Sequence, residues 1–444
     1  MLTYELNKQP GIPLYEHLYR CIREDILSGH LTPGSKLPSK RALAAHLKVS
    51  KITVEGAYNQ LLGEGYIRSA QRAGYFVESL QQTIRPVQAK MPVPITEEPD
   101  LSGTPQFPFT VWSRLQREVM LDLGQGLLQP MPNIGILALR QAIADHLMAF
   151  RGLAVDPENI LVGAGTDFLY NLLIQLLGRN LGYAVEEPGY GKIRKIYDAG
   201  GVRCVSASMD EKGVNPQDLK GAQVLHISPA HHFPTGIVTP MDRRLALLEW
   251  AGEDKWIIED DYDSEFRFTA RPMAAMASLD RRGRVIYMNT FSKSLAPSIR
   301  ISYMVLPRQL MARFQEKLGF YSCTVPSFEQ HTLARFLQEG HFDKHINRSR
   351  RFYKARRDQV LALIGNQGTI LEENAGLHFL LKLDTQLSDR ALEEKCRSFG
   401  LPLRALSSYY HQPSAMQDTH SLVVSYAGLS DNDLNKLQTL LNEL

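Results

Sequence analysis

The stretch Thr290–Val305, TFSKSLAPSIRISYMV, places Lys293 between two serines and puts Arg300 seven residues further on. It follows Val285-Ile286-Tyr287-Met288, an apolar run that favours a buried β-strand. A lysine that forms an imine must lose its proton, which a partly buried and electropositive setting favours. Thr290, Ser292 and Arg300 add groups that bind phosphate. The stretch therefore predicts a reactive lysine beside a phosphate site at the end of a strand.

The chain of 444 residues is too long for one compact core, so it predicts two or more domains. A proline-rich stretch over 79–99 lacks helical or strand periodicity and predicts an extended linker. It separates an N-terminal unit, 1–78, from a body over 100–444. In the body, helical patterns alternate with strand candidates at 159–163, 223–228, 255–260 and 284–289. This alternation indicates an α/β domain with a mainly parallel sheet. A small C-terminal α+β lobe, from about 330–370 onward, has strand candidates at 377–383 and 421–427.

Composition narrows the class of protein. The net charge of +3 decides little, and the four cysteines are scattered without CxxC pairs. We therefore expect no zinc site, no disulfide framework and a reducing cytoplasm. The N-terminus has no apolar signal core, and no window reaches about 18 uninterrupted apolar residues. A soluble cytoplasmic protein without a membrane partner is the prediction.

Residues 13–78 show the pattern of apolar residues that is typical of a helix–turn–helix followed by a hairpin. The residues expected to face inward are Leu43, Ala44, Leu47, Val49, Val54, Ala57, Tyr58 and Leu61. That leaves Ser50, Lys51 and Thr53 at the exposed start of a recognition helix. Between Lys36 and Arg72 there are seven basic and two acidic residues, the local positive charge that DNA phosphates require. A three-helix unit that docks onto protein is the alternative.

The stretch GSKLPSKRALAAHLKVSKITVEGAYNQLLGEGYIRSAQRAGYFV (34–77) resembles the winged helix–turn–helix of the GntR regulators. The resemblance implies DNA contacts at Arg41, Ser50, Lys51, Thr53 and, at the tip of the wing, Arg72 and Gly74. Glu55 departs from the family, in which an arginine is frequent at this place. An acid there should repel phosphate and change the way bases are read.

Three further features of the body fit a cofactor with a ring nitrogen and a phosphate. Asp260 ends an apolar strand and offers a carboxylate to a ring nitrogen, and Tyr262 offers a hydroxyl to the ring. Gly165 and Thr166 open a predicted helix whose free amides and positive end favour phosphate. Tyr190, after a Pro-Gly turn, is a candidate to stack on the ring. Together with Lys293 they predict pyridoxal phosphate. For the acidic run EDDYD alone, a surface loop or a metal site is the alternative, and we expect no metal.

Five stretches of the body occur in the order found in fold-type I pyridoxal-phosphate enzymes, the aspartate aminotransferase superfamily. They are PNIGILALRQAIADHLMAFRGL, VGAGTDFLYNLL, SPAHHFPTG, IIEDDYDSEF and TFSKSLAPSIRISYMVLP. The resemblance implies that Lys293 forms the internal aldimine, Asp260 pairs with the ring nitrogen and Tyr262 meets the ring oxygen. It implies that Tyr190 stacks on the ring. The implied phosphate ligands are Thr166, Thr290, Ser292 and Arg300.

The whole chain, a GntR-like head on an aminotransferase-like body, resembles the MocR/GabR family of bacterial transcription regulators. Two departures bear on its chemistry. Phe233 stands where aminotransferases usually have an asparagine that bonds the ring oxygen, and His231 or His232 is the predicted substitute, with a packing or turn histidine as the alternative. Val423 replaces the arginine that usually grips a substrate carboxylate. Arg404 and Lys192 are the candidates for an effector carboxylate.

We therefore expect a pyridoxal-phosphate-dependent transcription regulator that senses an amine or amino acid, or pyridoxal phosphate itself, through aldimine chemistry at Lys293. Its expected partners are a double-stranded DNA operator, the effector and a second copy of the chain in a domain-swapped homodimer. The alternative is a competent aminotransferase whose N-terminal unit serves regulation or docking, and partial transamination is compatible with both. A structural DNA-binding protein with an inactive body is a third reading.

Overall fold

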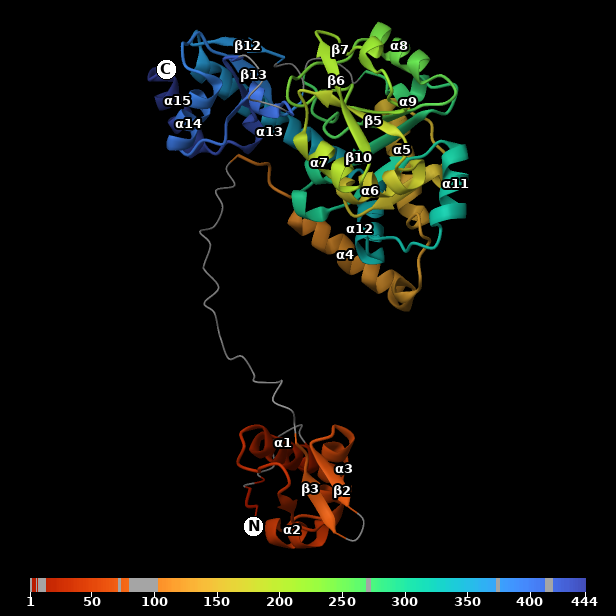
Figure 1. Cartoon of the computed structure of the whole chain (residues 1–444), viewed down its shortest axis with the longest axis vertical. Helices are drawn as coiled ribbons and strands as arrows, with labels where there is room; N and C mark the ends of the chain where they lie inside the picture. The colour runs from red at the N-terminus through yellow and green to blue at the C-terminus, as the bar shows by residue number, and fades with distance from the viewer. Residues whose placement is uncertain are drawn as a thin grey trace. The chain divides into compact units, whose positions relative to one another are not determined.

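The computed structural model describes residues 2–4, 6, 13–70, 73–79, 103–268, 273–372, 376–411 and 418–444. The chain forms two compact units, Met1–Glu97 and Glu98–Leu444 (Figure 1). All of the predicted linker 79–99 except Ser79 lies outside the described residues. Within the described ranges, no helix has the length and apolar character needed to cross a bilayer.

The N-terminal unit is a three-helix head with a small antiparallel sheet. Its helices are α1 (Leu14–Leu27), α2 (Lys40–Leu47) and α3 (Lys51–Gly63), and its strands are β1 (Lys36–Leu37), β2 (Ile67–Ala70) and β3 (Gly74–Val77), in the order β1-β3-β2. Of the residues predicted to face inward, Leu43, Ala44, Val54, Ala57, Tyr58 and Leu61 are buried, and Leu47 and Val49 are half-buried. The predicted helix–turn–helix with a β-wing is confirmed.

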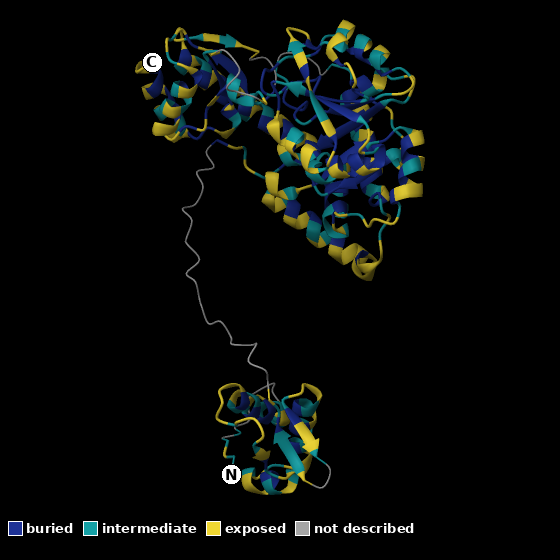
Figure 2. Cartoon of the chain, viewed as in Figure 1, coloured by how far each residue is buried: buried dark blue, intermediate teal, exposed yellow. Residues whose placement is uncertain are grey.

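The body is built on an eight-stranded sheet in the order β4-β11-β10-β9-β8-β5-β6-β7. Its strands are β4 (Ile160–Gly163), β5 (Gly182–Glu187), β6 (Arg203–Asp210), β7 (Gly213–Val214), β8 (Val224–Ile227), β9 (Trp256–Asp260), β10 (Val285–Thr290) and β11 (Ser302–Val305). β10, β9, β8, β5 and β6 pair in parallel, whereas β11 and β7 run antiparallel to their neighbours. Every residue of β4, β8, β9 and β10 is buried, as expected for strands covered on both faces (Figure 2).

Helices cover both faces of this sheet. Alternate residues of a strand point to opposite faces, so they belong to two different cores. Val162, Tyr287 and Tyr303 pack with α5 (Leu137–Arg151) and α12 (Ser327–Gln338), whereas Ile286 and Met304 pack with α6 (Thr166–Leu177) and α11 (Arg308–Leu318). The other helices of this part are α4 (Phe109–Leu123), α7 (Gly191–Ala199), α8 (Met241–Ala251), α9 (Met276–Leu279), α10 (Phe291–Ser294) and α13 (His341–Ile364). The predicted α/β class is confirmed.

A second sheet forms the small C-terminal lobe. Its strands are β12 (Thr369–Leu371), β13 (Phe379–Lys382), β14 (Arg404–Ala405) and β15 (Ser421–Val424), all antiparallel and in the order β12-β13-β15-β14. They are accompanied by α14 (Asp389–Ser398), α15 (Asp431–Asn442) and the 3-10 turn η5 (Leu406–Tyr409). The α+β lobe predicted from its two strand candidates is therefore present.

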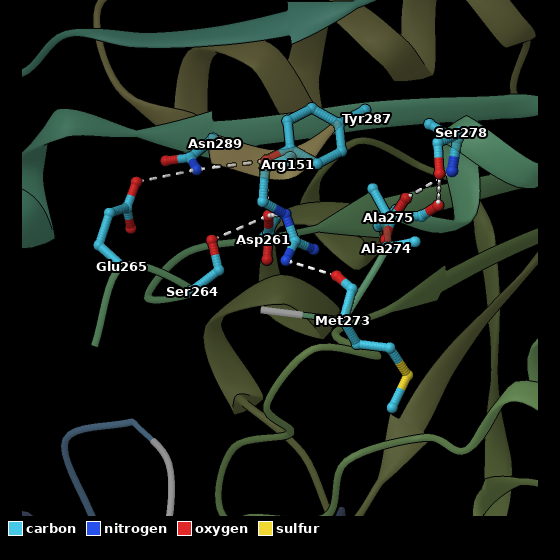
Figure 3. A network of polar contacts seen from close by, with 12 residues as sticks. Arg151, Asp261, Ser264, Glu265, Met273, Ala274, Ala275, Ser278, Tyr287 and Asn289 are labelled. Atoms are coloured by element: carbon cyan, nitrogen blue, oxygen red, sulfur yellow. Dashed lines mark hydrogen bonds and ion pairs between the residues drawn. The ribbon is translucent and has the colours of Figure 1, made fainter. Parts of the chain in front are cut away.

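A buried polar network fixes the segment that follows β9 (Figure 3). The Arg151 Nε lies 3.0 Å from the Asp261 Oδ2, and both side chains are almost fully buried. The hydroxyls of Tyr287 and Ser264 donate to the same carboxylate at 2.5 and 3.0 Å. The ion pair and these hydrogen bonds offset part of the cost of burying the Asp261 charge and hold the residues on either side of it in place, although the Asp261 Oδ1 has no hydrogen-bond partner. The four acidic residues of the run EDDYD are thus buried, and the surface-loop alternative for it is wrong.

Candidate cofactor site and DNA-binding surface

The predicted cofactor residues converge on one edge of the large sheet. Asp260 ends β9 and Thr290 ends β10, and α10 with Lys293 follows at once. The register pairs Met288 with Asp260, Thr290 with Ser302, and Ser302 with Gly163. The carboxyl ends of parallel strands meet at the same edge of a sheet, which is where α/β proteins bind ligands.

Asp260 is 4% exposed, and its carboxylate is only half satisfied. Its Oδ2 accepts a hydrogen bond from the Tyr170 hydroxyl and lies 3.3 Å from the His226 Nε2. The His226 Nδ1 lies 2.6 Å from the Tyr197 hydroxyl, so a chain of polar groups orients the carboxylate. Its Oδ1 is buried and has no hydrogen-bond partner. A buried oxygen of this kind is costly unless a donor meets it, and a protonated ring nitrogen is such a donor.

Sequence reasoning missed the two groups that contact Asp260. Tyr170 lies four residues into α6, and His226 is a buried polar residue inside the otherwise apolar β8. A histidine within an apolar strand was an available signal for His226. No signal within α6 distinguishes Tyr170 from its apolar neighbours, because its partner is far away in the sequence.

Gly165 and Arg300 form the phosphate side of the site. Gly165 precedes α6 with a φ of +90°, and a Cβ there would lie 2.1 Å from an Arg300 guanidinium nitrogen. The same guanidinium lies 3.7 Å from the Asp167 carboxylate, which also binds the Lys192 ammonium at 2.6 Å. Arginine and the first amides of a helix are both suited to an anion. Thr166 is the first residue of that helix.

The hydroxyl groups of the site differ in their availability. The Thr290 Oγ1 accepts bonds from the Ser292 amide at 3.1 Å and the Ser302 hydroxyl at 2.7 Å, so it caps α10. The Ser292 Oγ is buried without a hydrogen-bond partner. The unpaired oxygens of Ser292 and Asp260, and the guanidinium packed on Gly165, fit a ligand with a phosphate at one end and a ring nitrogen at the other.

Lys293 is exposed in α10, which differs from the partly buried setting expected from the sequence. A lysine that reacts with an incoming ligand has to be reachable, which an exposed position provides. Tyr190 is 51% exposed at the start of α7, and its ring lies 6.0 Å from that of Phe233. An aromatic ring with one open face is able to stack on a ligand.

The two candidate histidines have different surroundings. The His231 Nδ1 lies 2.8 Å from the Asp263 carboxylate and 3.3 Å from the Tyr262 hydroxyl, and its Nε2 has no hydrogen-bond partner. His232 instead bonds Thr235 of the same turn at 2.7 Å, and burial lowers its pKa to about 3. His231 is therefore the histidine beside Tyr262, and the turn-histidine alternative fits His232.

One buried group has the composition of a metal site. Ligand atoms of His231, Asp263 and His378 lie within 4.8 Å of one another. The His231 Nδ1 is already bonded to the Asp263 carboxylate without an ion, whereas the Nε2 atoms of His231 and His378 have no hydrogen-bond partner. Our sequence prediction that no metal binds stays a prediction.

Replacing Gly165 by alanine should weaken phosphate binding by at least tenfold, because the new methyl group would displace the Arg300 guanidinium. Gly178→Ala is the matched control. Gly178 also has a positive φ, +112°, at the other end of α6, but nothing lies within 4 Å of its Cβ position. Titration of both variants with pyridoxal phosphate separates the steric effect from backbone strain. Equal affinities in the two variants would contradict this role of Arg300.

On the head, the predicted DNA contacts begin at the turn before α3. The Ser50 hydroxyl accepts a bond from the Thr53 amide at 3.1 Å and so caps the helix. Ser50, Lys51 and Arg41 are exposed, and Thr53 is half-buried. Gly74 begins β3. Arg72 lies outside the described residues.

Sequence reasoning missed Ile52, which is 79% exposed on the recognition helix next to Lys51. A large apolar side chain on a DNA-facing surface is suited to the methyl group of thymine. The signal was available, because Ile52 falls outside the inward-facing positions of the helix.

Glu55 is paired with a cation, which changes the expectation that it repels phosphate. The Lys40 Nζ lies 2.8 Å from its carboxylate, and this hydrogen bond lowers the pKa of Glu55. The acid therefore neutralises a nearby lysine of the basic surface.

Replacing Glu55 by glutamine should free the Lys40 charge and strengthen DNA binding several-fold. The slope of log affinity against log salt should become steeper by up to about 0.9. Glu16→Gln, which releases Arg20 from a similar pair on α1, is the control. Anisotropy titrations at several salt concentrations measure both quantities. Weaker binding by the Glu55 variant would show that the acid itself contributes to recognition.

Comparisons with known proteins agree with both parts of the fold. A model described as bacterial regulatory proteins, gntR family, matches residues 14–77, and aminotransferase class I and II matches residues 97–440. A kynurenine aminotransferase from Pyrococcus horikoshii is 24% identical with a TM-score of 0.66, over 78% of this chain and 89% of that one. An archaeal alanine:glyoxylate aminotransferase is 24% identical with a TM-score of 0.67, over 76% and 88%. The body thus has the fold of a class of enzymes that depends on pyridoxal phosphate.

Relatives that are transcription regulators align with this chain along nearly their whole length. The Bacillus subtilis HTH-type transcriptional regulator YdeL is 37% identical over 98% of this chain and 97% of the relative. The probable rhizopine catabolism regulatory protein MocR of Rhizobium meliloti is 31% identical over 97% and 93%. The pyridoxine biosynthesis regulator PdxR of Corynebacterium glutamicum is 32% identical over 92% and 91%. The chain belongs to the MocR/GabR family of helix–turn–helix transcription regulators.

Proposed function

We propose that this regulator binds a double-stranded DNA operator through α3 and senses a small amine through pyridoxal phosphate held at Lys293. The observation that carries the proposal is the buried, unpaired Oδ1 of Asp260 at the strand edge where Lys293 also lies. An unpaired carboxylate oxygen is costly in a structural role and useful in a ligand site.

The residues would divide the work of holding the cofactor. Asp260 would accept a hydrogen bond from the protonated ring nitrogen. Tyr262 and His231 would form hydrogen bonds with the ring oxygen. Tyr190 would stack on the ring. The phosphate would lie against Arg300, Ser292, Thr290 and the helix start at Gly165 and Thr166. Bound in this way, the cofactor supplies an aldehyde, and Lys293 and incoming amines compete for it.

A route from the effector to the heads would run through the start of the body. Gly103 is buried, and a Cβ there would lie 2.4 Å from the Leu429 carbonyl oxygen of the small lobe. The chain therefore enters the body against the lobe that carries β15. Movement of this lobe on effector binding would move the point to which the head is tethered. The effector could control DNA binding in this way if it binds one position of the lobe more tightly than the other.

We further propose a homodimer, domain-swapped so that one subunit's head lies over the other's body. Two heads would read two half-sites of an operator. Support comes from α4, where Phe109 and Leu121 are among the exposed large apolar residues, the kind of surface that an oligomer covers.

The second candidate is a competent aminotransferase, which the fold of the body favours. Val423 argues against efficient turnover of ordinary α-amino acids, because it removes the usual carboxylate arginine. Partial transamination of an effector agrees with either candidate, so turnover by itself does not separate them.

The test measures DNA affinity of the full chain, loaded with pyridoxal phosphate, for its own upstream intergenic DNA across a panel of amines. At least one amine should change the dissociation constant about 5- to 150-fold. Lys293→Ala should bind DNA normally but not respond, whereas Lys317→Ala, an exposed lysine on α11, should respond as the unaltered protein does. Turnover without specific DNA binding would favour the aminotransferase.

A further inference from the structure

Arg404 lies beside the position from which the usual carboxylate arginine is missing. In the small-lobe sheet, Arg404 of β14 is paired with Val423 of β15, and Val423 is paired with Leu380 of β13. Residues directly opposite one another in antiparallel strands share a face, with Cβ atoms about 5 Å apart. The face thus formed is opposite to the one that packs into the core through Ala405 and Leu422. Arg404 therefore lies on the neighbouring strand, next to the position of the missing arginine and on the same face of the sheet.

A continuous line of aromatic rings joins Arg404 to the cofactor residues. Its guanidinium carbon lies 5.6 Å from the centre of the Tyr409 ring. The Tyr409 ring lies 5.2 Å from Phe233, and Phe233 lies 6.0 Å from Tyr190. We call Tyr190, Phe233 and Tyr409 the aromatic wall. The Gly189 amide donates to the Tyr409 carbonyl oxygen at 3.1 Å, which fixes the wall across the two lobes.

The charge around Arg404 leaves it able to bind an anion. Its Nε lies 3.8 Å from the Glu393 carboxylate, outside hydrogen-bonding distance, and its side chain is 58% exposed. The same oxygen of Glu393 already accepts bonds from the Ala405 amide and the Ser408 hydroxyl, so it holds the segment that carries Arg404. A guanidinium stacked on a ring is ordered and presents its edge to a carboxylate.

Lys192, the other candidate, belongs to the phosphate side of the site. Its ammonium lies 2.6 Å from the Asp167 carboxylate, which also lies 3.7 Å from Arg300. A lysine engaged in this way is poorly placed to serve as the anchor of an effector. The two cations that the sequence offered as effector candidates therefore differ in their partners.

We infer that Arg404 binds a carboxylate of the effector, whose apolar part lies along the Phe233 and Tyr409 rings of the aromatic wall. The inference rests on the proposed function, because the amine end of the same molecule reacts at the Lys293 site. The effector class is an amine that carries a carboxylate and an apolar segment. Amines that lack the carboxylate should bind less tightly.

The test compares matched ligands with the full chain loaded with pyridoxal phosphate. The pairs are phenylalanine with phenethylamine and 5-aminopentanoate with pentylamine, each pair differing in the carboxylate. Half-saturating concentrations come from the visible spectrum and from the amine dependence of DNA affinity. In the unaltered protein, the carboxylate member of at least one pair should bind more tightly. Arg404→Gln should lower the affinity for that member roughly 10- to 150-fold. It should change the affinity for the amine without a carboxylate in the same pair less than about twofold.

Two further variants make the result specific. Arg404→Lys keeps the positive charge but lacks the planar guanidinium that can donate two parallel hydrogen bonds. It should recover part of the affinity for the carboxylate ligand. Arg397→Gln removes an exposed arginine from α14 and should change nothing. A carboxylate preference that is absent from the unaltered protein, or that survives in Arg404→Gln, overturns the inference. Failure of the proposed function can be distinguished from failure of this inference, because the cofactor spectrum would then respond to no amine at all.

Discussion

Asp260→Asn will bind pyridoxal phosphate roughly 10- to 150-fold more weakly than the unaltered chain. The Asp260 carboxylate is buried, and one of its oxygens has no partner in the protein. Asparagine has nearly the same shape but no charge, so it cannot stabilise a protonated ring nitrogen. A charge-assisted hydrogen bond of this kind contributes about 1.5–3 kcal/mol, which sets the expected range.

Two further substitutions define the origin of this loss. Tyr170→Phe removes the hydroxyl that bonds the other carboxylate oxygen but keeps the charge, so it should cost less than about tenfold. Asp254→Asn, at an exposed position, is the control and should have no effect. Spectral titration with the cofactor measures all three. Normal cofactor affinity in Asp260→Asn would mean that the ring nitrogen lies elsewhere.

The second large effect is expected on the head. Arg41→Ala combined with Lys51→Ala should weaken binding to the operator by at least tenfold, because both cations are exposed at the start of the helix–turn–helix surface. If both contact phosphates, the slope of log affinity against log salt should fall by about 1.8. Anisotropy titrations between low and moderate salt give both values.

The control for the head variant lies in the body. Lys317→Ala also removes an exposed cation and should leave the affinity and its salt dependence unchanged. If the double variant lowers affinity without changing the salt slope, its residues contact bases and not phosphates. Unaltered affinity would remove α3 and its flanking turn from the DNA interface.

Much of the fold could be predicted because several strands of the large sheet are mainly apolar and rich in β-branched residues. β4, β8, β9 and β10 are buried on both faces, so their sequences stand out from the surrounding helices. β11 was not predicted as a strand. It follows the short turn at Pro297–Ile299, and its pairing with β10 and β4 depends on neighbours distant in the sequence.

The candidate site was predictable in its residue types and not in its contacts. Lys293, Asp260 and Arg300 stand out through local motifs. The partners of these residues come from remote elements, such as Tyr170 for Asp260 and Gly165 for Arg300. The pairing of Lys40 with Glu55 crosses from one helix to another in the same way. Motifs report which groups are present, whereas packing decides which of them remain available to a ligand.

The proposed sensing function depends on a covalent bond between the cofactor and Lys293. Borohydride reduction of the full chain after incubation with pyridoxal phosphate, followed by peptide mass spectrometry, measures this directly. We expect one reduced pyridoxyl adduct, on the peptide that contains Lys293, and no adduct on that peptide when an effector amine is added before reduction. An unmodified Lys293, or an adduct confined to other lysines, would contradict the proposed function.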